Sequence, residues 1–222
     1  MIKIKEDELF EEWRQQCPDL VADGLVDEGA YNATGLKLLI VLKEVNDPGG
    51  GDWDLRDLVK EGKRPQTWDN VARWVHGIRN IDNVPTWDFY RDIDDNFRIE
   101  TLRSICAVNL KKSPGGHTAD NGTIWQDMQK DLPFLQKQFS LYNPDLVVCG
   151  GTGDMFHWVI SQDGGQYKWE TTSRGVCYFD WNGAPVVAFP HPLARVPSNI
   201  LMYAFIDAVT EILRKKREAT LK

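Results

Sequence analysis

The chain has 222 residues, with 26 basic and 33 acidic side chains and a formal net charge of −7. Hydrophobic residues make up 42% and charged residues 27%, which is globular composition and excludes a mainly disordered chain. The acidic balance differs from the basic surface of a general nucleic-acid binder. The 9 Trp, 9 Phe and 6 Tyr residues, however, supply many flat faces on which a ligand could stack.

The sequence predicts a cytoplasmic protein that does not contact a membrane. The N-terminal residues lack the apolar stretch of a signal peptide. The longest apolar run, Leu38 to Leu42, is far shorter than the roughly 20 residues of a membrane helix. The cysteines are far apart: Cys17, Cys106, Cys149 and Cys177. We therefore expect reduced structural thiols and no bound metal or other cofactor.

An N-terminal helix is expected at about 5–16. Four short apolar runs then predict strands buried on both faces. They are Lys37–Val45, Ser104–Leu110, Asp145–Gly151 and Pro185–His191. Such runs, alternating with helical patterns, are typical of a parallel sheet. Asn182-Gly183 is a strong hairpin signal and predicts an antiparallel neighbour, Cys177–Trp181, for the last strand.

Helical patterns occupy the segments between the strands. They are Thr67–Arg79, Gly122–Leu141, Thr152–Ser161 and Ser198–Lys216. Thr67 is a suitable N-cap for the first of these helices. Pro133 is expected to break or kink the second. The acidic segment Asp82–Glu100 is expected to be irregular. We predict one α/β domain over residues 1–222, with its core at about 37–213. Its architecture is expected to be a three-layer α/β/α arrangement around a four-stranded, mostly parallel sheet.

Polar side chains and glycines follow each predicted strand, where ligands of open α/β sheets bind. Glu44 and Asp47 follow the first strand and Asn109 follows the second. Gly151 follows the third and His191 the fourth. These groups suit a polar planar ligand beside a phosphate. The glycine-rich loops match neither the dinucleotide-binding nor the P-loop spacing.

Several short motifs occur in a familiar order. They are Leu42-Lys43-Glu44-Val45-Asn46-Asp47-Pro48, Pro65-Gln66-Thr67-Trp68-Asp69-Asn70-Val71, Asn109 at the end of the second strand, and His191-Pro192 after the fourth. Together with the hairpin, they resemble the motifs of the uracil-DNA glycosylase superfamily. Lys43 stands where that family has a leading glycine, and Leu193 stands where it has the serine of a His-Pro-Ser motif.

The resemblance implies a DNA glycosylase-like enzyme that acts in base excision during DNA repair. It implies that Glu44, by strand register, or Asp47, by its Asp-Pro dipeptide, orients the attacking water. Asn109 would read the edge of uracil or another damaged base. His191 would stabilise the leaving base, and Trp53 would stack on the flipped base.

The same resemblance implies contacts to DNA phosphates. Thr67 occupies the position of a phosphate-contacting serine, and Lys111, Lys112 and Arg195 are cations near predicted strand ends. Because Lys111 and Lys112 are consecutive, at most one of them faces the site. Two other functions stay open: a catalytically inactive protein that binds a nucleobase, nucleotide or nucleic acid, and a glycosidase of small nucleosides, which the net charge of −7 would suit.

Overall fold

The computed structural model describes residues 1–47, 53–63, 65–116 and 118–220. Within these residues, seven strands form one sheet in the order β1-β3-β2-β4-β7-β6-β5. The strands are β1 (Gly24–Leu25), β2 (Leu38–Leu42), β3 (Ile105–Asn109), β4 (Leu146–Gly150), β5 (Glu170–Thr171), β6 (Cys177–Trp181) and β7 (Ala184–Phe189). The fold is therefore mixed α/β, with a sheet larger than the predicted four strands.

The four predicted apolar runs form the parallel centre of the sheet. β2 pairs in parallel with β3 and with β4, and β4 pairs in parallel with β7. The predicted hairpin is also confirmed, since β6 and β7 are antiparallel. Asn182 and Gly183 between them have φ angles of 53° and 85°, the left-handed pair that this turn requires. The extra strands β1 and β5 are two-residue antiparallel additions to β3 and β6, too short to produce a pattern in the sequence.

The predicted helices are present, together with others. The helix bounds are α1 (Ile2–Arg14), α2 (Glu28–Ala33), α3 (Leu55–Lys60), α4 (Pro65–Arg79), α5 (Trp87–Tyr90), α6 (Asp95–Leu102), α7 (Asn121–Lys130), α8 (Leu132–Phe139), α9 (Gly153–Ser161) and α10 (Ser198–Thr220), with a 3-10 turn η1 (Ile81–Asn83). The segment Asp82–Glu100 is not irregular throughout, since it contains α5 and most of α6, and α2 and α3 were not predicted. The predicted break near Pro133 separates α7 from α8. Thr67 is not an N-cap, because α4 begins two residues earlier at Pro65, a residue favoured in the first turn.

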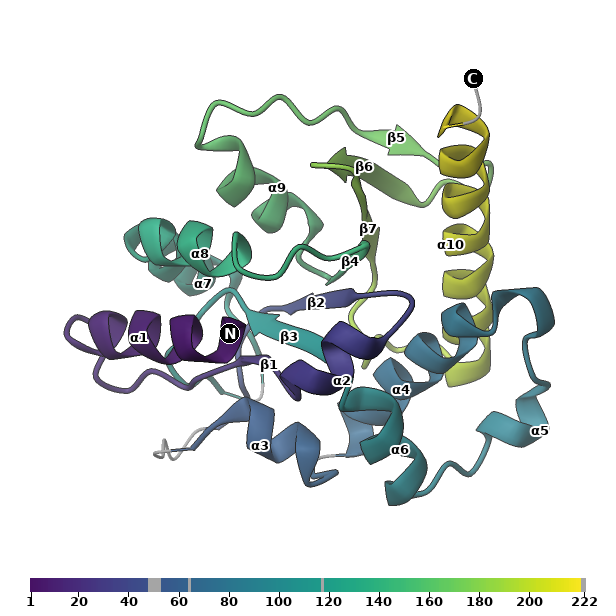
Figure 1. The fold of residues 1–222 in the computed structure, drawn as a ribbon, viewed down its shortest axis with the longest axis horizontal. Coiled ribbons are helices and arrows are strands. Elements are labelled where there is room, and N and C mark those ends of the chain that lie inside the picture. Colours follow the sequence, from purple (N-terminus) through teal and green to yellow (C-terminus); the bar gives the residue numbers. More distant parts are fainter. Residues whose placement is uncertain (48–52, 64, 117, 221–222) are drawn as a thin grey trace.

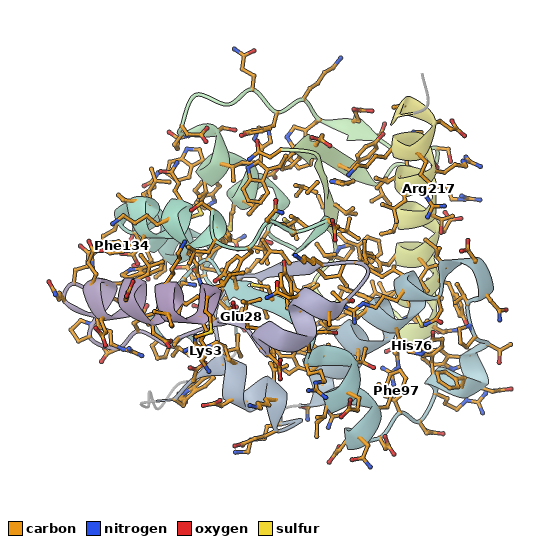
Figure 2. The ribbon with its side chains drawn as sticks, in the orientation of Figure 1. Lys3, Glu28, His76, Phe97, Phe134 and Arg217 are labelled. Carbon is orange, nitrogen blue, oxygen red and sulfur yellow. The ribbon has the colours of Figure 1, made fainter. Side chains whose placement is uncertain are left out.

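Helices cover both faces of the sheet, and side chains fill the space on either side (Figures 1 and 2). Alternate residues of β2 point to opposite faces: Leu38, Ile40 and Leu42 pack with α4 and α10, whereas Leu39 and Val41 pack with α1, α7, α8 and α9. The described residues include no helix with the length and apolar character that crossing a bilayer requires.

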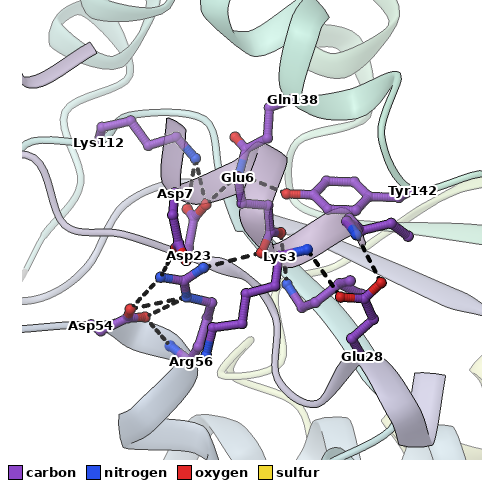
Figure 3. Close-up of polar contacts among 12 residues, drawn as sticks. Lys3, Glu6, Asp7, Asp23, Glu28, Asp54, Arg56, Lys112, Gln138 and Tyr142 are labelled. Atoms are coloured by element: carbon purple, nitrogen blue, oxygen red, sulfur yellow. Dashed lines mark hydrogen bonds and ion pairs between the residues drawn. The ribbon is translucent and has the colours of Figure 1, made fainter. Parts of the chain in front are cut away.

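A buried polar network joins α1 to the end of β3 (Figure 3). The Glu6 carboxylate accepts hydrogen bonds from the Leu25 amide at 3.0 Å and from Arg56 Nη1 at 3.0 Å. Burial raises the pKa of Glu6 to about 7, and the hydrogen bonds from Leu25, Tyr142 and Arg56 offset only part of that effect. Near it, the fully buried Lys112 donates to both oxygens of Asp23 at 2.7 Å.

We predict that Glu6 makes the protein less stable as the pH rises. In the unfolded chain Glu6 loses its proton near pH 4.5, but in the folded protein it keeps that proton until about pH 7. Stability is therefore fully present below pH 4.5 and falls as the pH rises towards 7, by up to about 3 kcal/mol. Denaturant unfolding between pH 4.5 and 8 should show that Glu6→Gln, which cannot ionise, loses less stability than the wild type over this range.

The matched control is Glu8→Gln, which makes the same change on the exposed side of α1. This control should keep the wild-type pH dependence. Parallel stability curves for Glu6→Gln and the wild type would show that Glu6 does not hold a proton in the folded protein.

Candidate functional site

A cleft of about 850 Å³ lies at the carboxyl edge of the parallel strands. Its walls come from the ends of β2 and β3, the first turn of α4, the loop after β7, and Gly116, Thr118 and Ala119. Glu44, Thr67, Asn109 and His191 all line it. Four residues chosen from separate motifs of the sequence therefore meet at one cavity.

The pairing of β2 with β3 sets the back of the cleft. Leu42 lies opposite Asn109, and the ladder continues beyond the strands, with the Leu110 amide donating to the Leu42 carbonyl at 3.0 Å. The Lys111 amide likewise donates to the Lys43 carbonyl at 2.9 Å. This extension brings the Lys111 side chain beside Glu44.

Glu44 and Lys111 form a buried ion pair. The Lys111 ammonium lies 2.6 Å from Glu44 Oε2, and each side chain is only 7% exposed. The ammonium also donates to the carbonyls of Ser113 at 3.3 Å and Pro114 at 3.1 Å. Gly115 packs against the carboxylate so closely that a Cβ there would lie 2.1 Å from Oε2. The carboxylate orientation is thus fixed by Lys111 on one side and by the backbone on the other.

Asn109 has a side-chain amide that is available to a ligand in the cleft. The residue is 4% exposed, and its backbone N–H donates to Asp23 Oδ2 at 2.8 Å. Its side-chain amide lines the cleft and makes no hydrogen bond within the described part of the chain. A buried amide offers one acceptor and two donors, so this group is suited to read the polar edge of a ligand.

His191 is held as a neutral hydrogen-bond donor. Its Nδ1 accepts the backbone N–H of Leu193 at 3.1 Å, so the ring proton of the neutral form is on Nε2. Burial lowers the pKa of His191, and the positive charge of Lys43 lowers it further. The imidazole therefore offers an Nε2–H to a ligand at neutral pH.

The loop that carries His191 is anchored to α4. Asn70 Nδ2 donates to the Pro192 carbonyl at 2.8 Å, and Arg73 Nη1 donates to Asn70 Oδ1 at 2.8 Å. Arg73 in turn donates to the Tyr90 carbonyl at 2.9 Å. These contacts connect two motifs that are over 100 residues apart in sequence.

Some predicted residues lie away from the cleft. Trp53 Nε1 donates to Asp47 Oδ2 at 2.6 Å, and neither residue lines the cavity. Pro48, which completes the predicted Asp-Pro dipeptide, lies outside the described residues. Lys112 is fully buried on the α1 side with Asp23, which leaves no surface for a phosphate contact. Arg195 is exposed but does not line the cleft.

Other residues line the cleft as well. Lys43 lines it and donates from Nζ to Asn121 Oδ1 at 2.9 Å, while Gln66, Trp68 and Thr118 complete its walls. Gln66 and Trp68 flank Thr67 in the sequence, which is the signal that could have identified them. No group of three or more His, Cys, Asp or Glu side chains in the described ranges is placed to hold a metal ion.

Comparison with known proteins finds neither a protein-family model nor a curated protein that matches this chain.

We predict that Gly115→Ala disrupts the ion pair of the cleft. The added methyl group would overlap the Glu44 carboxylate, so the pair with Lys111 must separate or the loop must move. We expect a loss of about 3–5 kcal/mol, as for other disrupted buried pairs. Denaturant unfolding measures this loss in the free energy of unfolding.

Gly116→Ala is the matched control, because a Cβ at that position meets nothing within 4 Å. Both substitutions remove one glycine from the same loop, so their effects on the unfolded chain are alike. Equal stability of the two variants would contradict the close packing of Gly115 on Glu44.

We also predict that Lys43 contributes to the lowered pKa of His191. Lys43→Gln removes a positive charge that disfavours the imidazolium, so the pKa of His191 should rise. NMR titration of the histidine Cε1 protons measures this shift, and His191→Gln assigns the resonance. Lys37→Gln, at the opposite end of β2, is the control and should leave the titration unchanged. A His191 pKa above the ordinary value of 6.5, or one insensitive to Lys43→Gln, would refute this assignment.

Proposed function

We propose that this protein binds a flipped nucleobase, uracil or another damaged base, and hydrolyses its N-glycosidic bond. The observation that carries the proposal is that Glu44, Asn109 and His191 line one cleft, although they come from three distant segments. The sequence motifs around them resemble those of the uracil-DNA glycosylase superfamily in order and position. Four parallel strands between helices on both faces also support a divergent form of that superfamily's three-layer fold.

Asn109 is assigned to base recognition. Its amide is buried, lines the cleft and has no partner within the described residues. Uracil carries an adjacent carbonyl and N–H, and one side-chain amide can donate to the first and accept from the second. This amide faces the solvent of the cleft, and a matching base edge would replace its contacts with water by hydrogen bonds.

His191 is assigned to the leaving base. When the glycosidic bond breaks, its electron pair stays with the base, and negative charge develops on the base oxygens. The Nε2–H of His191 is fixed by the Leu193 amide on the opposite nitrogen and can donate to such an oxygen. A preorganised donor of this kind is worth about 2.7–4 kcal/mol in a transition state.

Glu44 is assigned to positioning the attacking water and to stabilising the charge on the sugar. Its carboxylate would accept a hydrogen bond from the water whose oxygen bonds to the sugar carbon, and would stabilise the positive charge that develops there. Lys111 and Gly115 fix the orientation of the carboxylate. Asp47 is the weaker candidate, because it accepts from Trp53 and does not line the cleft.

A second function is favoured by one observation. Lys111 occupies one oxygen of Glu44, and the Glu44 side chain is only 7% exposed. A carboxylate held in this way is less available to water. A protein that binds a nucleobase in the same cleft without cleaving it would have the same Asn109 and His191 geometry.

The test is incubation with a uracil-containing oligonucleotide and detection of abasic sites, with free deoxyuridine as a parallel substrate. We expect abasic sites, and a loss of about 10²–10³-fold in rate for His191→Gln. Asn109→Ala should also lose activity. The controls are His76→Gln and Asn80→Ala, which make comparable changes outside the cleft.

The outcomes separate the candidate functions. Binding without abasic sites would favour the inactive binding protein, and cleavage of deoxyuridine alone would favour a nucleoside glycosidase. An absence of both binding and cleavage for every deaminated or alkylated base would refute the proposal.

A further inference from the structure

A second cavity, of about 950 Å³, lies beside the candidate cleft. It is bounded by the first turns of α7, α9 and α10, the start of β6 and the end of β7. Its walls are mainly apolar and include Trp125, Met155, Trp169, Val196 and Ile200. Val196 and Ile200 are 41% and 57% exposed, so the rim of this cavity presents apolar side chains to solvent. We call this cavity the aromatic groove.

The aromatic groove and the cleft share a thin wall. His191 lines the cleft, and its neighbour Pro190 lines the groove. Lys43 lines the cleft and donates to Asn121, which lines the groove. At Gly151 in the same wall, a Cβ would lie 3.7 Å from the His191 Cβ and 3.8 Å from the Lys43 Cε. The two cavities are therefore separated by the width of about one residue, with the Lys43 ammonium at the boundary.

The charges at the two cavities limit the ligand. Among the described lining residues, Lys43 is the only lysine or arginine, and it is accompanied by the acidic Glu44 and Asp154. A protein that tracks duplex DNA neutralises many phosphates, whereas the described lining of the two cavities offers one lysine. Indole rings and exposed aliphatic side chains instead suit unstacked bases, which a single strand presents.

We propose that the aromatic groove binds the nucleotide next to the base held in the cleft, so that the substrate is a single-stranded nucleic acid of two or more nucleotides. The linking phosphate would lie at Lys43, and the neighbouring base would pack on Trp125 or Trp169. This inference rests on the proposed function of the cleft and adds the identity of its substrate class.

Binding is measured with 2′-fluoro-2′-deoxyuridine, whose fluorine slows glycosidic cleavage. This nucleoside is compared with its dinucleotides with thymidine in both orders, with a short single strand that contains it, and with the matching duplex. One order of dinucleotide should bind about 5–150-fold more tightly than the nucleoside, the gain expected for one stacked base. Its affinity should fall with salt with a logarithmic slope of about −0.7, as for one phosphate contact.

Two isoleucines provide a matched pair of variants. Ile200→Glu places a negative charge on the rim of the aromatic groove, in the third position of α10. Ile4→Glu makes the same change in the third position of α1, where Ile4 is 48% exposed and lines neither cavity. Ile200→Glu should abolish the dinucleotide gain and leave nucleoside binding intact, whereas Ile4→Glu should change neither. Trp125→Ala should reduce the same gain.

The results distinguish the two levels of the proposal. If the nucleoside binds but neither dinucleotide binds more tightly, or if Ile200→Glu and Ile4→Glu behave alike, the aromatic groove is not a nucleotide site and the proposed function stands. Tighter binding of the duplex than of the single strand would also overturn this inference. If the nucleoside, the dinucleotides and the strands all fail to bind, the proposed function fails and this inference fails with it.

Discussion

The parallel register of β2 against β3 is the constraint on which the candidate site depends. Leu42 lies opposite Asn109, and backbone hydrogen bonds continue the pairing to Lys43 and Lys111. β4 and β7 extend the same parallel sheet, so the loop after β7 brings His191 to the same edge. A shift of one residue in this register would turn Asn109 towards α1 and separate Lys111 from Glu44, because side chains alternate between the faces of a sheet.

Two consecutive lysines at the end of β3 have separate structural partners. Lys111 pairs with Glu44 on the cleft side, and Lys112 pairs with Asp23 on the side covered by α1. Each pair is buried, where a lone charge would be costly, so each lysine serves its partner rather than a ligand. Asp23 also accepts a hydrogen bond from the backbone N–H of Asn109, which connects the α1 network to the site. Two of the cations expected to contact DNA phosphates therefore support the strand end instead.

The sequence predicted those elements of the fold that depend on residues close together in the chain. The four apolar runs, the Asn182-Gly183 turn and the break near Pro133 each depend on neighbouring residues. Placing Glu44, Asn109 and His191 together required only the rule that parallel strands share a carboxyl edge. The partners of Lys111 and Lys112 were not predictable, because they lie 67 and 89 residues away in sequence. The bond between Trp53 and Asp47 depends on loop geometry that has no period, so position along the chain could not show that neither residue lines the cleft.

The charge distribution of the cleft suits the proposed reaction better than a basic groove would. A neutral base is recognised by hydrogen bonds, for which the Asn109 amide and the His191 Nε2–H are available. In the proposed reaction the leaving base becomes an anion, and Lys43 would then act in two ways. Its positive charge adds to the larger effect of burial in lowering the pKa of His191, which disfavours the imidazolium. The same charge would attract the developing anion, so Lys43 would favour both a neutral donor at His191 and the negative charge of the leaving base.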